Sequence, residues 1–250
     1  MKLHGTNRMR EGLNHAMDIH SGKAVIDGPK NYLMPLYKAM PIGITVEGAN
    51  IVTRNLIVFG QGSIRAHPHL LDEMQALEEE DEEKSIEAFD RHFWAHVGHS
   101  TKTFFRALGR GWTGGLFAPA PDAGGATWIY RQVARWSAAY ALTADFAFLT
   151  MGGGLKRKEM ISARMGDILS DLYILTAALK RWQDDGRPSA DLPLLEHSAH
   201  SALARIHRSM DEVLANLPAR WAAWLLRAVT RTGRAARGPN DNVTQACAEL

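Results

Sequence analysis

One carboxylate stands alone in the apolar run PIGITVEGANIV, residues 41–52, where Glu47 is the only charged residue. An unpaired carboxylate in apolar surroundings is costly, and the pKa of such a group tends to rise. It therefore either has a cationic partner or acts as a base in a dry pocket. Arg54 is the candidate partner, but on a helix it would lie about 10 Å along the axis, too far for direct contact without a bend. Both interpretations of Glu47 stay open at this point.

Three histidines form a second candidate site. His92, His96 and His99 have the spacing i, i+4, i+7, which places them near one helix face where a metal ion could bind. No cluster of carboxylates or cysteines stands near them in the sequence, and apolar side chains share the helix. We therefore expect no metal site, and a metal-binding helical protein is kept as an alternative that elemental analysis would identify.

The segment 216–239 is basic and contains no acidic residue. Its arginines are Arg220, Arg227, Arg231, Arg234 and Arg237, and we expect Trp221, Trp224, Leu225 and Val229 on the opposite side. A basic helix with aromatic anchors can lie on an anionic membrane surface. It can equally pack on its own bundle with its arginines outward. No motif indicates nucleic-acid binding, and the net charge of +2 gives no general attraction for it.

Helical periodicity runs through nearly the whole chain, with no alternating strand pattern, and it predicts an all-α fold of bundled helices. Turns are predicted at the Gly- and Pro-containing segments 25–32, 39–43, 111–127 and 184–193. The glycines of MGGGL, 151–155, predict a bend between two helices rather than a phosphate loop. We expect helices over roughly 3–20, 30–39, 47–78, 84–109, 127–151, 155–184, 194–216 and 219–232.

The composition is that of an ordinary globular protein, with 46% hydrophobic and 22% charged residues in 250. A single cysteine, Cys247, excludes a disulfide framework within the chain and favours a reducing compartment. The chain has no apolar run of about 18 residues that would indicate a transmembrane helix. The acidic run 77–87 is a plausible boundary between two helical units.

The sequence resembles the end of the catalytic region of acyl-CoA dehydrogenases, closest to the long bacterial fatty-acyl-CoA dehydrogenases with an extra C-terminal helical domain. The resemblance rests on VEGANIVTR, FGQGSIRAHP, MGGGLKR, ISARMGDILSDLY and ADLPLL, in that order, and covers essentially the whole chain. It implies that residues 1–80 end the catalytic helical bundle. Residues 81–250 would form the bacterial-type C-terminal helical domain.

In that family the Glu of a Glu-Gly-(Thr/Ala)-x-x-x-x-Arg pattern is the catalytic base, which here corresponds to Glu47, Gly48, Ala49 and Arg54. The resemblance implies oxidation of a fatty acyl-CoA to the trans-2-enoyl-CoA of fatty-acid β-oxidation. A carboxylate removes the α-proton while the β-hydrogen leaves as hydride to FAD. Apolar neighbours would make the base stronger.

Flavin contacts are implied for Gly22, Gly48 and His20, with changes from the usual pattern. The family's paired glycines, which approach the FAD of a neighbouring subunit, read Ser21–Gly22 here, and the threonine that often follows Glu-Gly is Ala49. The family also implies an electron-transfer flavoprotein as acceptor, a homo-oligomer, and a cytoplasmic location with possible inner-membrane association. It leaves the acyl-chain length undetermined.

The family's N-terminal helical and middle β-domains have no counterpart in these residues. We therefore expect the chain to be the C-terminal portion of a longer enzyme, with little dehydrogenase activity and no tight FAD binding alone. A non-catalytic helical module for protein interaction or membrane docking is the alternative function.

Overall fold

The computed structural model describes residues 2–232 and 237–250, apart from the side chain of Lys156, and these residues form helices and no strand, which confirms the all-α prediction. The first part comprises α1 (Lys2–His20), α2 (Gly22–Val25), α3 (Leu33–Thr45), α4 (Asn50–Val52), the π-helical η1 (Thr53–Gln61), α5 (Gly62–Ala66) and α6 (Leu70–Ala76). The rest comprises α7 (Glu82–Trp112), η2 (Gly124–Ala126), α8 (Thr127–Met151), η3 (Gly152–Arg157), α9 (Glu159–Asp184), η4 (Ser189–Asp191), α10 (Leu192–Asn216), α11 (Arg220–Thr230) and α12 (Asp241–Ala248).

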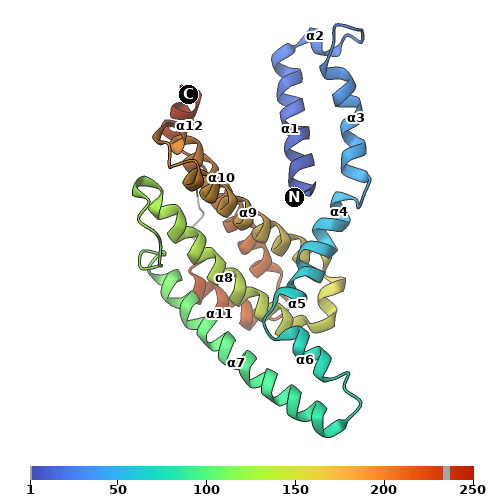
Figure 1. Cartoon of the computed structure of the whole chain (residues 1–250), viewed down its shortest axis with the longest axis vertical. Coiled ribbons are helices and arrows are strands. Elements are labelled where there is room, and N and C mark those ends of the chain that lie inside the picture. Colours follow the sequence, from blue (N-terminus) through green and yellow to red (C-terminus); the bar gives the residue numbers. More distant parts are fainter. Residues whose placement is uncertain (1, 233–236) are drawn as a thin grey trace.

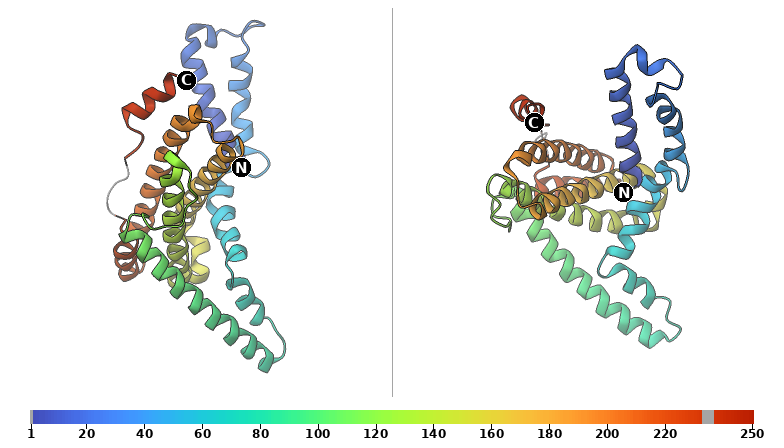
Figure 2. Two further views of the ribbon diagram at one scale, coloured as in Figure 1. Left: turned by 60° about the vertical axis from the view of Figure 1, so that its left-hand side comes forward. Right: turned by 45° about the horizontal axis from the view of Figure 1, so that its top comes forward.

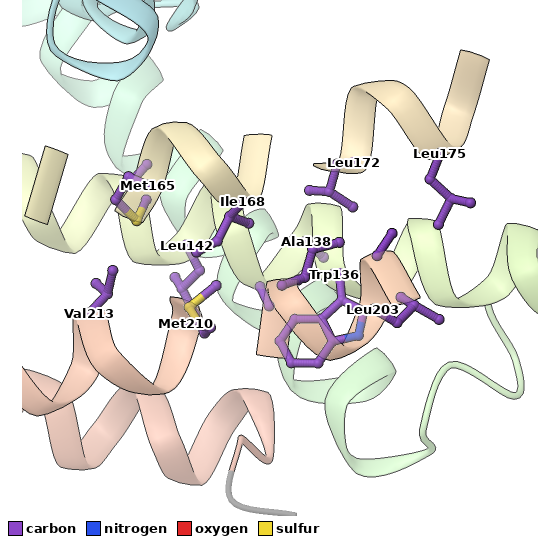
Figure 3. Packing of buried hydrophobic residues seen from close by; sticks show 14 of the residues in the cluster. Trp136, Ala138, Leu142, Met165, Ile168, Leu172, Leu175, Leu203, Met210 and Val213 are labelled. Atoms are coloured by element: carbon purple, nitrogen blue, oxygen red, sulfur yellow. The ribbon is translucent and has the colours of Figure 1, made fainter. Parts of the chain in front are cut away.

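The main core lies between α8, α9 and α10, with α7 and α11 covering α8 (Figure 1). The side chains that meet there come from three helices, as Figure 3 shows for Leu142 of α8, Ile168 of α9 and Met210 of α10. Each is at most 1% exposed, so each contributes about 1.5–3 kcal/mol of burial free energy. This bundle is the rigid body to which the earlier helices attach.

Helices α1 and α3 form an antiparallel hairpin that projects from this body in all three views (Figures 1 and 2). Its own small core contains Leu13, Ala24, Leu33 and Met40. The main core begins in the chain at Phe59 of η1, so the break between the two hydrophobic clusters falls between α3 and η1. The domain boundary at residues 80 and 81 stays a prediction.

The predicted continuous helix over 47–78 is wrong. A loop of residues 46–49 precedes α4, the helix widens to a π-helix in η1, and a turn at His67, Pro68 and His69 separates α5 from α6. Pro68 forces the residue before it out of the helical conformation, and His67 accordingly has ψ of 133°. Apolar periodicity alone cannot distinguish a π-helix from an α-helix, because both bury one stripe.

Three smaller predictions also need correction. The predicted turn at 39–43 is helical, because α3 continues through Pro41 to Thr45. The helix predicted from 155 begins as α9 at Glu159, after the 3-10 segment η3 makes the bend expected at the three glycines. The short helices α2 and α12 were not predicted. The helix over 127–151 agrees with α8 at both ends.

Helix η1 packs directly on α9, and this contact joins the hairpin to the bundle. A Cβ at Gly166 of α9 would lie 3.2 Å from the carbonyl oxygen of Arg54, so a larger residue would push the two backbones apart by a few tenths of an ångström. Phe59 of η1 is fully buried and stacks on Phe148 of α8, with 5.8 Å between ring centroids. The start of η1 is therefore fixed relative to α8 and α9.

Among the described helices, none is by itself long and apolar enough to cross a membrane. In the described part of the chain, one pair of consecutive helical segments, Leu33–Thr45 and Asn50–Ala66, is together long and apolar enough to span a membrane, but it is bent by 43° between its two parts.

We predict that Ser21→Gly stabilises the protein by about 1 kcal/mol, because Ser21 occupies a backbone conformation that disfavours a Cβ. Ser21 has φ 51° and ψ −136°, close to the φ 48° and ψ −133° of Gly152 at the end of α8. The reverse change, Gly152→Ser, should therefore destabilise by about 1–2 kcal/mol. Urea unfolding with an unchanged m-value measures both effects, and a destabilised Ser21→Gly would contradict the prediction.

Candidate functional site

Glu47 lies in the loop of residues 46–49, at the junction of α3 and α4. Its φ is 54° and that of Gly48 is 85°, so two consecutive residues adopt left-handed backbone conformations. For a non-glycine residue this is uncommon and costs of order 1 kcal/mol or more. The strain turns the chain sharply out of α3 and places the Glu47 side chain outside either helix.

The expected apolar enclosure of Glu47 is wrong for the described part of the chain. Glu47 is exposed, and its neighbours Ile42 and Val46 are 59% and 47% exposed. The reason is the left-handed turn, which ends α3 before Glu47 can face the hairpin core. The loop thus presents a carboxylate within an uncovered apolar surface.

Two side chains anchor this loop to the start of α1. The Lys2 ammonium donates to the carbonyl oxygen of Gly48 at 2.9 Å. Buried Asn50, directly after the loop, donates to the Thr6 hydroxyl at 2.8 Å and to the Asn7 side-chain oxygen at 3.1 Å. The loop conformation is therefore held by contacts more than forty residues apart in sequence. Sequence reasoning missed both anchors, since neither belongs to a recognisable motif.

The predicted pairing of Glu47 with Arg54 is also wrong. Arg54 of η1 forms a two-pronged ion pair with Asp167 of α9, with Nε–Oδ1 at 2.8 Å and Nη2–Oδ2 at 2.6 Å. Hydrogen bonding to Asp167 raises the pKa of Arg54. Among the described residues Glu47 has no ion-pair partner. Its carboxylate is free to act on another molecule.

A polar cavity of about 780 Å³ lies beside this ion pair, between α1, α9 and α10. Asp171 and Arg205, which line it, form a second two-pronged pair with Nη2–Oδ1 at 2.7 Å. Cations and carboxylates both line the cavity, so its charges largely compensate one another. It is therefore a polar, solvent-open junction between the hairpin and the bundle.

Gly22 and His20 lie at the other end of the hairpin from Glu47 and Gly48 (Figure 1). Helix α3 separates the two groups by about 20 Å, given 1.5 Å per residue. His20 is held by the carbonyl oxygen of Ala16 at its Nδ1, 2.9 Å away, and by the Tyr32 hydroxyl at its Nε2, 2.6 Å away. A Cβ at Gly22 would meet nothing within 4 Å, so this backbone is open to a partner. One cofactor could contact both groups only by spanning the hairpin or by joining two subunits.

The structure gathers histidines, but not the three that the spacing suggested. His96 and His99 of α7 meet His67 and His69 of the α5–α6 turn, and the ring centroids of His67 and His96 are 4.5 Å apart. His92 lies elsewhere, with its Nδ1 3.6 Å from a carboxylate oxygen of Asp72.

Carboxylates complete this cluster. Asp145 of α8 contacts His67, and Glu73 of α6 contacts His96 at 2.8 Å. The closely spaced histidines that flank Pro68 could have drawn attention to the turn. No sequence signal pointed to Asp145.

Hydrogen bonds fix where His67 carries its proton. Its Nδ1 accepts the backbone N–H groups of His69 at 3.2 Å and Leu70 at 3.1 Å, which caps the start of α6. Nε2 must then carry the proton and donate to Asp145 Oδ1 at 3.2 Å. A metal ion at Nε2 would need that proton moved to Nδ1, where two N–H groups already point. Although ligand-type atoms of His67, His96 and Asp145 lie within 4.8 Å of one another, the cluster is built as a hydrogen-bond network.

The basic C-terminal segment departs from its predicted pattern. Val229 is buried, whereas Trp221 and Trp224 are 57% and 67% exposed, so the apolar residues of α11 do not share one face. The reason is that α11 packs on α7 and α8 through its small and aliphatic residues. Trp224 lies outside this contact, and Trp221 touches the bundle only edge-on, with its ring centroid 6.0 Å from that of Phe146 of α8. Arg234 lies outside the described residues.

These observations define a helical bundle that carries a strained, anchored glutamate loop at its edge. A family model described as "Acyl-CoA dehydrogenase, C-terminal, bacterial type" matches residues 64–250, and the chain belongs to this family. A crystal structure of an acyl-CoA dehydrogenase from Bacillus anthracis, complexed with FAD, has a similar fold, with a TM-score of 0.66 and 16% identity. The match covers 98% of this chain and 37% of that one, so the present chain spans little over a third of the length of that enzyme.

We predict that His99 makes the protein less stable as the pH falls below 6.5. Burial lowers the pKa of His99 below its usual 6.5, an effect that Asp145 opposes and that His67, His69 and Arg106 reinforce. The unfolded chain therefore takes up a proton before the folded protein does, so the free energy of unfolding falls from about pH 6.5 towards the folded-state pKa. His99→Gln should flatten this part of a stability–pH curve measured by urea unfolding. Equal stability–pH curves for His99→Gln and the parent protein would refute the prediction.

Proposed function

We propose that this chain forms the base-bearing part of a flavin-dependent acyl-CoA dehydrogenase, with Glu47 removing the α-proton of a fatty acyl-CoA. The observation that carries this proposal is the position of Glu47 in a strained, anchored and accessible loop, in a chain that belongs to the family. A free carboxylate held this way is suited to catalysis, because strain is retained where function selects it.

In the proposed reaction a Glu47 carboxylate oxygen takes the proton from the carbon next to the thioester carbonyl. The electrons of that C–H bond form the new carbon–carbon double bond, and the β-hydrogen leaves with its electron pair. Bound FAD would accept this hydride. The backbone at Gly48, which carries no Cβ, leaves the thioester room to approach.

An exposed carboxylate becomes a strong base only when water is excluded around it. Ile42 and Val46 provide one apolar wall of such a site. The acyl chain of the substrate, together with further protein surface, would complete the enclosure. The uncovered apolar wall beside Glu47 is what such a closure requires.

Flavin binding by this chain would be partial. The accessible backbone at Gly22, with Ser21 in a conformation typical of glycine, fits close approach of a planar or phosphate group, and His20 lies beside it. No enclosed cavity at Gly22 or Glu47 stands out among the described residues, so the rest of a flavin pocket would come from other segments or a second subunit. A homo-oligomer with electron transfer to an electron-transfer flavoprotein is the arrangement we propose, in the cytoplasm or at the inner membrane.

In the flavin-loaded enzyme that contains this chain, Glu47→Gln should abolish turnover of a fatty acyl-CoA and leave flavin absorbance unchanged. The amide keeps the shape of the side chain but cannot accept the α-proton, and loss of a general base typically costs 10²–10⁴-fold or more in rate. Stopped-flow bleaching of the flavin on mixing with acyl-CoA measures the step directly.

The matched control is Glu78→Gln, an exposed glutamate in the acidic run, which should bleach at the parental rate. Parental bleaching by Glu47→Gln would rule out this residue as the base.

A second candidate function is peripheral membrane contact through α11, which presents Trp221 and Trp224 to solvent beside Arg220. Interfacial tryptophans and arginines of this kind favour an anionic surface. Trp221→Ser combined with Trp224→Ser should reduce co-sedimentation with phosphatidylglycerol vesicles several-fold, and added salt should weaken binding of the parent protein. Trp94→Ser, which removes an exposed tryptophan of α7, is the control. Equal sedimentation of all three proteins would exclude α11 as the contact.

A further inference from the structure

A cavity of about 900 Å³ lies at a second place in the molecule, between the end of α7, the first half of α8, the middle of α10 and the end of α11. No lining residue comes from α1 to α6, so the cavity is separate from the Glu47 loop, which lies across the body in Figure 1. Its volume is within the range of small-molecule sites.

The charged side chains that line this cavity are arginines. Among the described residues that line it there is no Asp or Glu. Its cationic and aromatic members are Arg135, Arg227, Arg231, Arg237, His200, His207, Trp112, Trp128 and Trp136. We call this the arginine–tryptophan cavity. Such a lining attracts anions and offers aromatic faces at the same place.

Arg135 is the most informative of these side chains. It is partly buried, its guanidinium lies over the Trp136 ring with Cζ 5.1 Å from the centroid, and its Nη1 donates to the side-chain oxygen of Gln132 at 3.4 Å. Among the described residues it has no carboxylate partner. Burial alone lowers the pKa of Arg135, with no acidic group to raise it. A partly desolvated guanidinium that no carboxylate neutralises is available to pair with an anionic ligand.

The other arginines are held in place around it. Arg227 is fixed by Asp211, with Nη2–Oδ1 at 3.0 Å. The Arg231 guanidinium lies over the Trp112 ring, 5.0 Å from its centroid. The helices behind them cross in close contact, since a Cβ at Gly111 would lie 2.5 Å from the carbonyl oxygen of Val229. The side of the cavity formed by α7 and α11 is therefore pre-formed, which lowers the entropy cost of binding there.

The aromatic side chains suit a planar ring as well as an anion. Trp112 is 63% exposed at the cavity, and Trp128 lies beside His200 with centroids 4.8 Å apart and planes inclined by 32°. A nucleobase can stack on such faces with about 1–3 kcal/mol per base. Inorganic phosphate would use the arginines but leave the tryptophans and most of the volume without contact.

We propose that the arginine–tryptophan cavity binds a nucleoside polyphosphate, with its phosphates on Arg135 and Arg231 and its base against Trp112 or Trp128. This is a second, non-catalytic ligand site, independent of proton abstraction at Glu47.

Isothermal calorimetry of the protein with ATP, tripolyphosphate and adenosine tests this proposal. ATP should bind at one site, and tripolyphosphate and adenosine should each bind at least tenfold more weakly, because each provides only one half of the recognition. Arg135→Met keeps the apolar stem and removes the charge, so it should weaken ATP binding roughly ten- to hundredfold. The apo melting temperature of Arg135→Met should stay close to that of the parent, because the change removes a partly buried charge that has no carboxylate partner and keeps the apolar stem over Trp136.

Arg231→Gln, at an exposed position, should weaken ATP binding in the same direction and guards against a folding defect in Arg135→Met. Arg181→Gln, on the exposed end of α9 and outside the cavity, removes the same charge and should bind ATP as the parent does. The proposal is overturned if ATP does not bind, if tripolyphosphate binds as tightly as ATP, or if the two cavity variants bind ATP as the parent does. Binding to anionic vesicles that Arg135→Met abolishes, without ATP binding, would assign the cavity to a lipid headgroup instead.

Discussion

The packing of η1 on α9 is the constraint on which the position of the Glu47 loop depends. Phe59 anchors η1 in the bundle core, Gly166 lets the two backbones approach, and Arg54 meets Asp167 at the junction. The Arg54 side chain is 40% exposed, so its ion pair contributes about 1 kcal/mol or less to stability. The two-pronged Arg54–Asp167 pair therefore adds little to the free energy of unfolding, but its geometry fixes the rotation of η1 about its own axis. The orientation of η1 in turn determines the orientation of the loop of residues 46–49 that precedes it.

The way the hairpin attaches to the bundle also explains why the Glu47 side chain is exposed to solvent. The hairpin of α1 and α3 buries its own small core and rests on the bundle only at its base, so the apolar residues of the loop face away from both cores. A solvated carboxylate is a weak base, and a desolvated one is a strong base. In the reaction proposed above, closing the site around Glu47 with substrate and further protein surface would therefore raise the basicity of its carboxylate. Basicity then depends on binding, which limits the reactivity of the open state.

The spacing of apolar residues predicted the helix bounds correctly where a single helix packs on one hydrophobic core. Helix α8 buries a regular stripe from Ile129 to Ala147, and its predicted bounds agree with the structure. The same spacing gave wrong helix bounds where the backbone leaves the helical conformation, as at Glu47 with its left-handed φ and at the turn before α6. The partner of Arg54 lies 113 residues away, so no local pattern could identify it. The family resemblance indicated Glu47, but how Lys2 and Asn50 hold its loop depends on contacts between residues more than forty positions apart, which no sequence motif predicts.

Most arginines that link two helices form ion pairs with carboxylates, whereas Arg135 and Arg231 of the arginine–tryptophan cavity do not among the described residues. Between helices, Arg54, Arg164, Arg205 and Arg227 each meet a carboxylate of another helix, and of these four Arg227 lines the arginine–tryptophan cavity. The chain has 29 Lys and Arg against 27 Asp and Glu, so carboxylates are not scarce. Their absence from the described lining of the arginine–tryptophan cavity is therefore specific to that place. An acid there would stabilise the empty protein and compete with an anionic ligand, so the unpaired state of Arg135 is best understood as a property selected for binding.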